Sequence, residues 1–153
     1  MKDNTIDAKD QIKWKWVKGA ATLKTEFGDP TTTDTYFLCV YDNGSRISAM
    51  TILPGGMCAG KPCWKSKSTG FAYKNKGLTP DGVLSATLKA GIDGKALVKV
   101  TAKGVNVPEP VLSSITGPVV VQFQVANSSL CFGATYSAPF KKSDGATFSD
   151  KAD

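Results

Sequence analysis

The stretch that decides the fold is Leu84–Val100, which reads LSATLKAGIDGKALVKV. Apolar residues occupy alternate positions from Leu84 to Ala90 and again from Ala96 to Val100. This period of two is typical of a β-strand with one buried face. The linking segment, Gly91-Ile92-Asp93-Gly94, is rich in residues that form turns. The stretch therefore predicts two strands joined by a turn.

Similar patterns on either side extend this prediction to the whole chain. Apolar residues alternate with lysines in Ile12–Trp16 and with glutamines in Val119–Val125, and Asp42-Asn43-Gly44 is a strong hairpin signal. No segment sustains helical periodicity, and glutamate, a good helix former, occurs only at Glu26 and Glu109. About eight or nine short strands result, with turn signals between them. The predicted fold class is all-β, an antiparallel β-sandwich that is immunoglobulin-like or jelly-roll-like.

The length and the polar segments bound the domain organisation. A chain of 153 residues suits one β-sandwich domain over residues 1–153. Its last part, residues 141–153, is polar, and we expect a loosely held C-terminal tail there. No apolar run approaches the roughly 18 residues that a membrane helix requires, so we expect no membrane insertion.

The charge is positive but of a particular kind. The formal net charge is +6, and eighteen of the nineteen cationic residues are lysine, with Arg46 the only arginine. Arginine supplies the bidentate fork that reads guanine edges and phosphates, so its scarcity argues against a nucleic-acid partner. The lysines are scattered and often alternate with apolar residues, which is typical of solvated strand faces. An anion-binding surface is the alternative interpretation.

The four cysteines are disulfide candidates. Cys58 and Cys63 lie close together in a loop rich in glycine and proline, whereas Cys39 and Cys131 lie in apolar strand-like runs where a bridge would join two strands. Three connectivities are open, and free buried thiols or a zinc site are the alternatives, although zinc usually needs two close pairs. Disulfides indicate an oxidising compartment, so we expect a secreted or cell-surface protein. The polar N-terminus carries no signal peptide, as expected if a leader has been removed or if the chain is part of a longer secreted one.

The absence of histidine is the strongest argument about chemistry. It removes the usual general base, the Ser-His and Cys-His nucleophile pairs and every histidine metal site. The acidic residues are few and sit mostly in turns and at the termini; Asp42-Asn43-Gly44 and Asp81-Gly82, for example, fit turns better than calcium ligands. We therefore predict no enzyme, no catalytic residue, no metal site and no cofactor.

Two aromatic residues are candidates for stacking on a sugar ring. Trp64 follows Cys63 in a loop and precedes Lys65-Ser66-Lys67, and Tyr73 lies in a short predicted strand nearby. Exposed aromatic rings present an apolar face to ligands, so Trp64 and Tyr73 predict a carbohydrate-binding surface. A tryptophan packed on a neighbouring disulfide is the structural alternative.

A family resemblance is carried by turn and strand segments spread over most of the chain. They are Cys63-Trp64-Lys65, Gly70–Lys74, Thr79-Pro80-Asp81-Gly82, Leu88–Gly91, Pro118–Asn127, Cys131 and Ser137-Ala138-Pro139 with Lys141 and Lys142, and less distinctly Ile12–Val17 and Leu38–Asp42. These segments are similar to a repeat-type β module of large, uncharacterised secreted proteins of deltaproteobacteria and related environmental bacteria. The resemblance implies secretion and a modular architecture, and it transfers no catalytic residues.

Together these features predict a non-catalytic structural or adhesive module of a secreted or surface bacterial protein or assembly. Its expected partners are other protein modules or a surface polysaccharide. A carbohydrate-binding module that uses Trp64 and Tyr73 is the alternative prediction.

Overall fold

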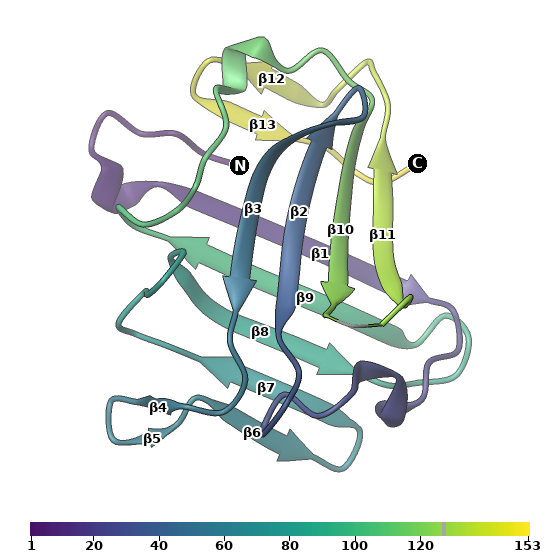
Figure 1. Ribbon diagram of the computed structural model, residues 1–153. Helices are drawn as coiled ribbons and strands as arrows, with labels where there is room; N and C mark the ends of the chain where they lie inside the picture. Colours follow the sequence, from purple (N-terminus) through teal and green to yellow (C-terminus); the bar gives the residue numbers. More distant parts are fainter. Residues whose placement is uncertain (127) are drawn as a thin grey trace.

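The computed structural model describes residues 1–126 and 128–153; Asn127, at the end of one segment of the resemblance, lies outside the described residues. Thirteen strands are present among the described residues, and nine of them form two antiparallel sheets that face each other (Figure 1). The five-stranded sheet has the order β1 (Gln11–Gly19), β9 (Ala96–Lys103), β8 (Val83–Lys89), β7 (Gly70–Lys74), β6 (Trp64–Lys67). The four-stranded sheet has the order β11 (Cys131–Tyr136), β10 (Val119–Val125), β2 (Tyr36–Asp42), β3 (Ser45–Ile52).

Short elements complete the fold. Two small hairpins are formed by β4 (Met57–Cys58) with β5 (Lys61–Pro62), and by β12 (Lys142–Asp144) with β13 (Thr147–Ser149). The helical segments are single 3₁₀ turns: η1 (Asp7–Lys9), η2 (Lys24–Phe27) and η3 (Leu112–Ser114). No helix in the described part of the chain is long and apolar enough to cross a membrane.

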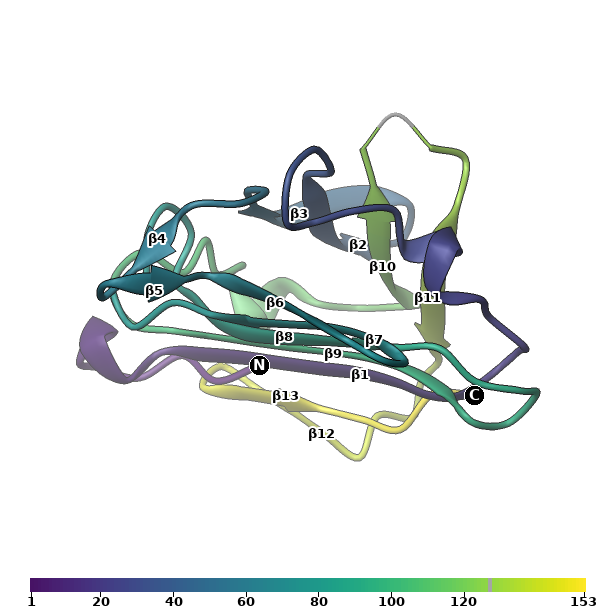
Figure 2. The same ribbon diagram turned by 90° about the horizontal axis from the view of Figure 1, so that it is seen from below.

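The two sheets form the layers of a sandwich (Figure 2), and their strands cross at a steep angle (Figure 1). The all-β antiparallel sandwich predicted from the sequence is confirmed. The steep crossing is nearer to orthogonal sheet packing than to the aligned packing of two similarly directed sheets.

The core lies between the sheets because alternation sends one set of side chains inward from every strand. Tyr36 is at its centre: the Tyr36 hydroxyl donates a hydrogen bond to the Phe27 carbonyl oxygen at 2.7 Å, and its ring stacks on Phe123 with centroids 5.2 Å apart. From the facing sheet, Val98 and Leu88 are fully buried. Each such large apolar side chain contributes about 1.5–3 kcal/mol of burial free energy.

The hairpin predicted from Leu84–Val100 is β8 and β9. One detail differs from the simple alternation: the register shifts between Val83 and Ser85, so Val83 is buried and Leu84 is only half-buried. A bulge of this kind adds one residue to a strand and changes the face to which its neighbours point.

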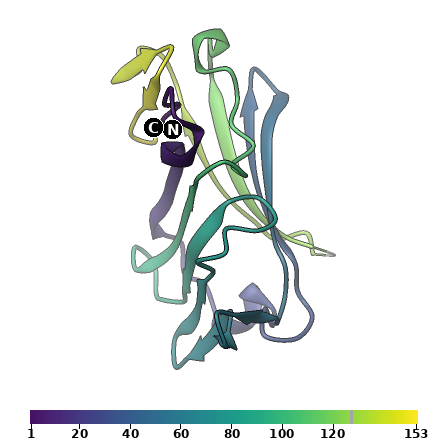
Figure 3. The same ribbon diagram turned by 90° about the vertical axis from the view of Figure 1, so that its left-hand side faces the viewer.

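The C-terminal residues are held more firmly than the sequence predicts. Lys2 forms β-bridges to both Gln11 and Thr147, which joins the β12–β13 hairpin to the edge of the five-stranded sheet (Figure 3). Phe148 is buried and contacts Phe140 edge-to-face, with ring centroids 4.9 Å apart. The expectation of a loose polar tail over 141–153 is therefore wrong for this hairpin, because one aromatic residue anchors it.

Candidate anion-binding face

The outward side of the five-stranded sheet gathers lysines from all five strands; we call it the lysine face. Alternation places the polar residue of each pair outward while its apolar neighbour enters the core. The lysines of this face are all exposed: Lys13, Lys15, Lys65, Lys67, Lys74, Lys89, Lys99 and Lys103. The five strands, which the structure describes in full, contain no aspartate or glutamate. Scattered in the sequence, these lysines form a single surface in the fold.

The register arranges this surface in rows that run across the strands. One row is Lys15, Lys99, Thr87, Ala72 and Lys65, from β1 to β6. Lysines therefore occupy both ends of the row, and small or hydroxyl side chains occupy its middle.

The neighbouring rows carry their lysines on other strands. Lys13, Thr101, Ser85 and Lys74 form the row before it, and Leu97, Lys89, Gly70 and Lys67 belong to the row after it. In each row small or hydroxyl side chains lie between two lysines, and together they form a shallow trough between two banks of lysine. Strands in a sheet are about 4.8 Å apart, so in the central row the backbones of β9 and β6 on the two sides of the trough are about 14 Å apart.

One pair of lysines in this arrangement lowers the stability of the fold when no anion is bound. Lys15 and Lys99 are directly opposite each other on neighbouring strands. Like charges in this position destabilise a sheet by up to several tenths of a kcal/mol. A bound anion between the two ammonium groups would relieve that repulsion.

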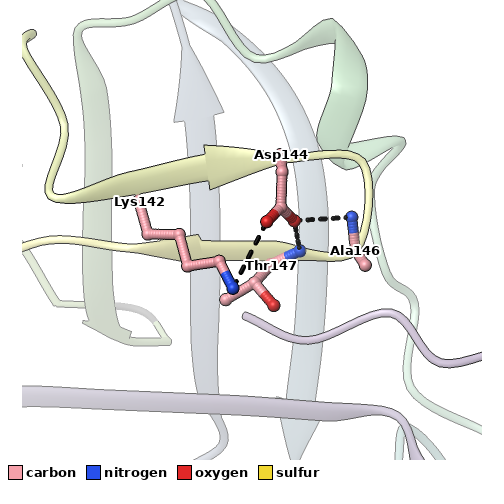
Figure 4. Close-up of polar contacts among 4 residues, drawn as sticks. All are labelled: Lys142, Asp144, Ala146 and Thr147. Carbon is pink, nitrogen blue, oxygen red and sulfur yellow. Dashed lines mark hydrogen bonds and ion pairs between the residues drawn. The ribbon is translucent and has the colours of Figure 1, made fainter.

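The lysine face is also not neutralised by ion pairs. Among the described residues the single ion pair joins Lys142 Nζ to Asp144 Oδ2, 3.3 Å apart, on the β12–β13 hairpin (Figure 4). Hydrogen bonds from the backbone N–H of Ala146, from Lys142 and from the backbone N–H of Thr147 hold the pKa of Asp144 below its ordinary value. The lysines of the face have no such partner, so their charge is available to an external anion.

A hollow of about 480 Å³ opens at the β6 and β7 side of the lysine face, and we call it the β6–β7 hollow. Its lysines are Lys61, Lys65, Lys67, Lys74 and Lys76. The remaining lining is mostly apolar and includes Ala72, Pro62 and the Cys58–Cys63 disulfide. The β4–β5 hairpin contributes to this lining and lies beside β6 (Figure 1).

Two of the four candidate cysteines form a disulfide. Cys58 and Cys63 are bonded, with their Cα atoms 4.9 Å apart, whereas Cys39 and Cys131 are free. Cys39 is opposite Gln122 and Cys131 is opposite Gln124, so β10 lies between the two thiols. Two strand spacings are about 9.5 Å, which exceeds the roughly 7 Å between Cα atoms that a disulfide can span. The expected bridge between these two strands is therefore wrong.

The free thiols differ in their surroundings. Cys39 is buried, whereas Cys131 lies in the edge strand β11 and is exposed. Burial of the thiol group nevertheless raises the pKa of Cys131 above its ordinary value. A raised pKa lowers the fraction of reactive thiolate, so Cys131 does not have the environment of a nucleophile.

The two candidate stacking residues are in the core. Trp64 is 2% exposed and Tyr73 is 6% exposed. Their rings contact each other with centroids 5.0 Å apart, and Trp64 Nε1 donates a hydrogen bond to the Leu53 carbonyl oxygen at 2.9 Å. Because neither ring presents a free face to solvent, the prediction that they stack on a sugar is wrong. Trp64 begins β6 rather than lying in a loop, and strand alternation turns it inward.

The aspartates of the turn segments Asp42-Asn43-Gly44 and Asp81-Gly82 have structural roles. Asp42 accepts a hydrogen bond from Gly117 N at 2.6 Å, and Asp81 accepts one from Thr51 N at 2.7 Å. Each carboxylate therefore joins a turn to a distant segment.

A different acidic cluster has the oxygen donors that a hard cation prefers. The carboxylates of Asp3, Asp10 and Glu109 lie within 4.8 Å of one another near the start of β1. Burial, and then a hydrogen bond with Asp10 and the charges of the neighbouring aspartates, raise the pKa of Glu109 to about 7. No sequence pattern indicates this cluster, because Glu109 is distant from the other two residues along the chain.

A second cavity, of about 250 Å³, lies between β1 and the strands β10, β11 and β13. Trp14 and Tyr136 both line it, and Trp14 Nε1 is buried without a hydrogen-bond partner. Burial raises the pKa of Tyr136 above its ordinary value. This cavity is about half the volume of the β6–β7 hollow.

The lysine face was visible in the sequence only in part. Alternation identified lysines such as Lys13 and Lys15 as outward-facing, but not which strands would become neighbours. No family model, curated protein or solved structure matches the chain.

Proposed function

We propose that the chain is a non-catalytic adhesive module of a secreted or surface bacterial protein, and that its lysine face binds an anionic polysaccharide. The observation that carries the proposal is the gathering of eight exposed lysines, with no acidic residue, on one face of the five-stranded sheet. An extended anionic polymer fits the trough between the two lysine banks.

The composition of the face favours a polysaccharide over other polyanions. Nucleic-acid surfaces combine cations with aromatic side chains that stack on bases and with arginine forks. The lysine face has neither, since Trp64 and Tyr73 point inward. Peripheral membrane binding needs several apolar side chains that enter the lipid, whereas the five strands expose one large apolar side chain, Val17, and the middle of the face consists of residues such as Ser85, Thr87 and Ala72. Hydroxyl groups of this kind are suited to hydrogen bonds with sugars.

The disulfide supports the proposed location, because such bonds persist in oxidising compartments. The absence of histidine, together with the absence of carboxylates from the five strands, supports a binding role rather than catalysis.

The expected binding is electrostatic and collective. A single exposed ion pair contributes only about 0.2–1 kcal/mol, so no one lysine determines the affinity. When several lysines contact one polymer, their contributions to the binding free energy add up. Raising the salt concentration from about 0.1 M to about 1 M shortens the screening length from about 10 Å to about 3 Å, and binding should weaken accordingly.

The test measures binding to polygalacturonate and to a sulfated dextran, with neutral dextran as the reference polymer. The triple variant Lys13→Gln, Lys15→Gln, Lys99→Gln should bind the anionic polymers about tenfold more weakly. The matched control is Lys9→Gln, Lys141→Gln, Lys151→Gln, which removes the same charge from outside the lysine face and should bind within about twofold of the parent protein.

Two results would overturn the proposal. Equal losses in both triple variants would show that net charge, rather than the arrangement of the face, determines binding. Binding to vesicles that contain anionic lipid, without binding to either anionic polymer, would assign the face to membranes.

A further inference from the structure

We propose that the β6–β7 hollow is a subsite that binds one acidic disaccharide unit of the polymer, so that the module recognises sugar as well as charge. This inference rests on the proposed function. Lys65, Lys67 and Lys74 belong to both surfaces, which makes the hollow continuous with one bank of the trough. Lys61 and Lys76 belong to the hollow alone.

The lining of the hollow has two chemistries. Five lysines supply cations around it, whereas Ala72, Pro62 and the disulfide supply apolar surface. Lys65 and Lys67 are opposite Ala72 and Gly70, so the residues between the lysines are small and leave space above the sheet. A pyranose ring has an apolar face of C–H groups, and its carboxylate or sulfate substituents project from the ring edge. This pairing of an apolar floor with a cationic rim matches an acidic sugar better than a free inorganic anion.

The size of the hollow sets the length of the unit that it holds. An apolar cavity of about 150 Å³ accommodates benzene, which has six non-hydrogen atoms. At the same density, the 480 Å³ of the hollow takes about twenty non-hydrogen atoms. That number is close to two sugar rings, so the expected ligand is a disaccharide unit rather than a single sulfate or phosphate.

The disulfide holds the wall of the hollow that the β4–β5 hairpin provides. Ala59 and Gly60 form its turn with positive φ angles of 52° and 76°. Cys63 is buried and donates a backbone hydrogen bond to Gly56 at 3.1 Å, and its bond to Cys58 ties the exposed turn to the core. Without this bond the hairpin keeps only the few backbone contacts of two-residue strands. The hollow should therefore lose its shape when the disulfide is removed.

The experiment compares digalacturonate, a sulfated disaccharide, maltose and inorganic sulfate by NMR titration. We expect at least one of the acidic disaccharides to shift the signals of Ala72 and of the residues around the disulfide, and maltose and sulfate to bind at least about tenfold more weakly. The hollow variant Lys61→Gln, Lys76→Gln should weaken disaccharide binding about fivefold and leave polymer binding within about threefold. The matched variant Lys13→Gln, Lys15→Gln should weaken polymer binding about fivefold and leave disaccharide binding within about threefold.

A third variant, Cys58→Ser with Cys63→Ser, should also lose disaccharide binding while it retains polymer binding. The inference is overturned if the anionic polymers bind but neither acidic disaccharide does, if sulfate binds as tightly as the disaccharides, or if both lysine pairs weaken disaccharide binding equally. In these cases the proposed function still stands. If no anionic polymer binds, the proposed function fails as well.

Discussion

The outer faces of the two sheets differ sharply, although both sheets cover the same core. The face of β1, β6, β7, β8 and β9 carries eight lysines, whereas the strands β2, β3, β10 and β11 contain no lysine at all. The outward residues of the four-stranded sheet are instead mostly uncharged, and Phe37, Tyr41, Val120, Gln122 and Gln124 are among them; the charged exception is Arg46, opposite Tyr41 on the edge strand β3. If lysines served only to keep the protein soluble, the more apolar of the two faces would need them most. Their restriction to one sheet supports the proposal that this sheet binds an anionic partner.

The largest expected effect concerns the inner side of the lysine-bearing sheet. Trp64→Ala should lower the free energy of unfolding by about 3–5 kcal/mol, because it removes a large buried ring and leaves a cavity. Urea unfolding measures the loss, and Leu53→Ala, at a side chain that is 54% exposed, is the control and should change stability by no more than about 0.5 kcal/mol. Polymer affinity of folded Trp64→Ala protein should stay within about twofold. If Trp64→Ala kept its stability but lost polymer affinity, Trp64 would instead belong to the binding surface.

The second prediction sets one outer face against the other at equal net charge. Lys15→Gln with Lys99→Gln, and Gln122→Glu with Gln124→Glu, each lower the net charge by two. The first pair should weaken polymer binding by about 1 kcal/mol, which is a factor of about five, whereas the second should change it by less than about twofold. The measurement is the affinity of both double variants for the anionic polymers at low salt concentration. If the two pairs weaken binding equally, the contrast between the faces has no functional meaning.

The smallest expected effect concerns the acidic border of the lysine face, where β1 begins. The folded protein raises the pKa of Glu109 from 4.5 to about 7, so it holds a proton there that the unfolded chain has released. This group therefore contributes stability that is full below about pH 4.5 and is lost as the pH rises to about 7.

Glu109→Gln should remove that dependence and raise stability at pH 8 by about 1 kcal/mol, which is below the full value of the shift because the side chain is partly exposed. Asp153→Asn, at an exposed carboxylate outside the cluster, is the control. Thermal unfolding between pH 4 and pH 8 measures both, and an unchanged slope in Glu109→Gln would contradict the prediction.

The alternating pattern was sufficient to predict most strands of the two large sheets, and the reasons why β6, the β12–β13 hairpin and other features escaped prediction are physical. Period-two patterns such as Leu84–Val100 report which side chains share a face of one strand. They do not report which strands become neighbours. The order of the strands creates the lysine face, and it also places β10 between the strands of Cys39 and Cys131, which are therefore about 9.5 Å apart. Trp64 was misassigned for a related reason: its flanking cysteine and lysines suggested a loop, whereas the pairing of Trp64 with Tyr73 made it a strand residue.

The bulges in the five-stranded sheet have a consequence for how strongly one module can adhere. The register is interrupted between Trp16 and Gly19 in β1 and between Val83 and Ser85 in β8. Between these interruptions the regular rows extend for only about 13 Å along the strands, since alternate residues are about 6.7 Å apart. If the lysine face binds a polymer as proposed, such a short footprint would engage only a brief stretch of it and release it readily. Firm attachment would then come from many modules that hold one polymer at once, because linkage makes each further binding event intramolecular and multiplies the overall strength by factors of about a hundred or more.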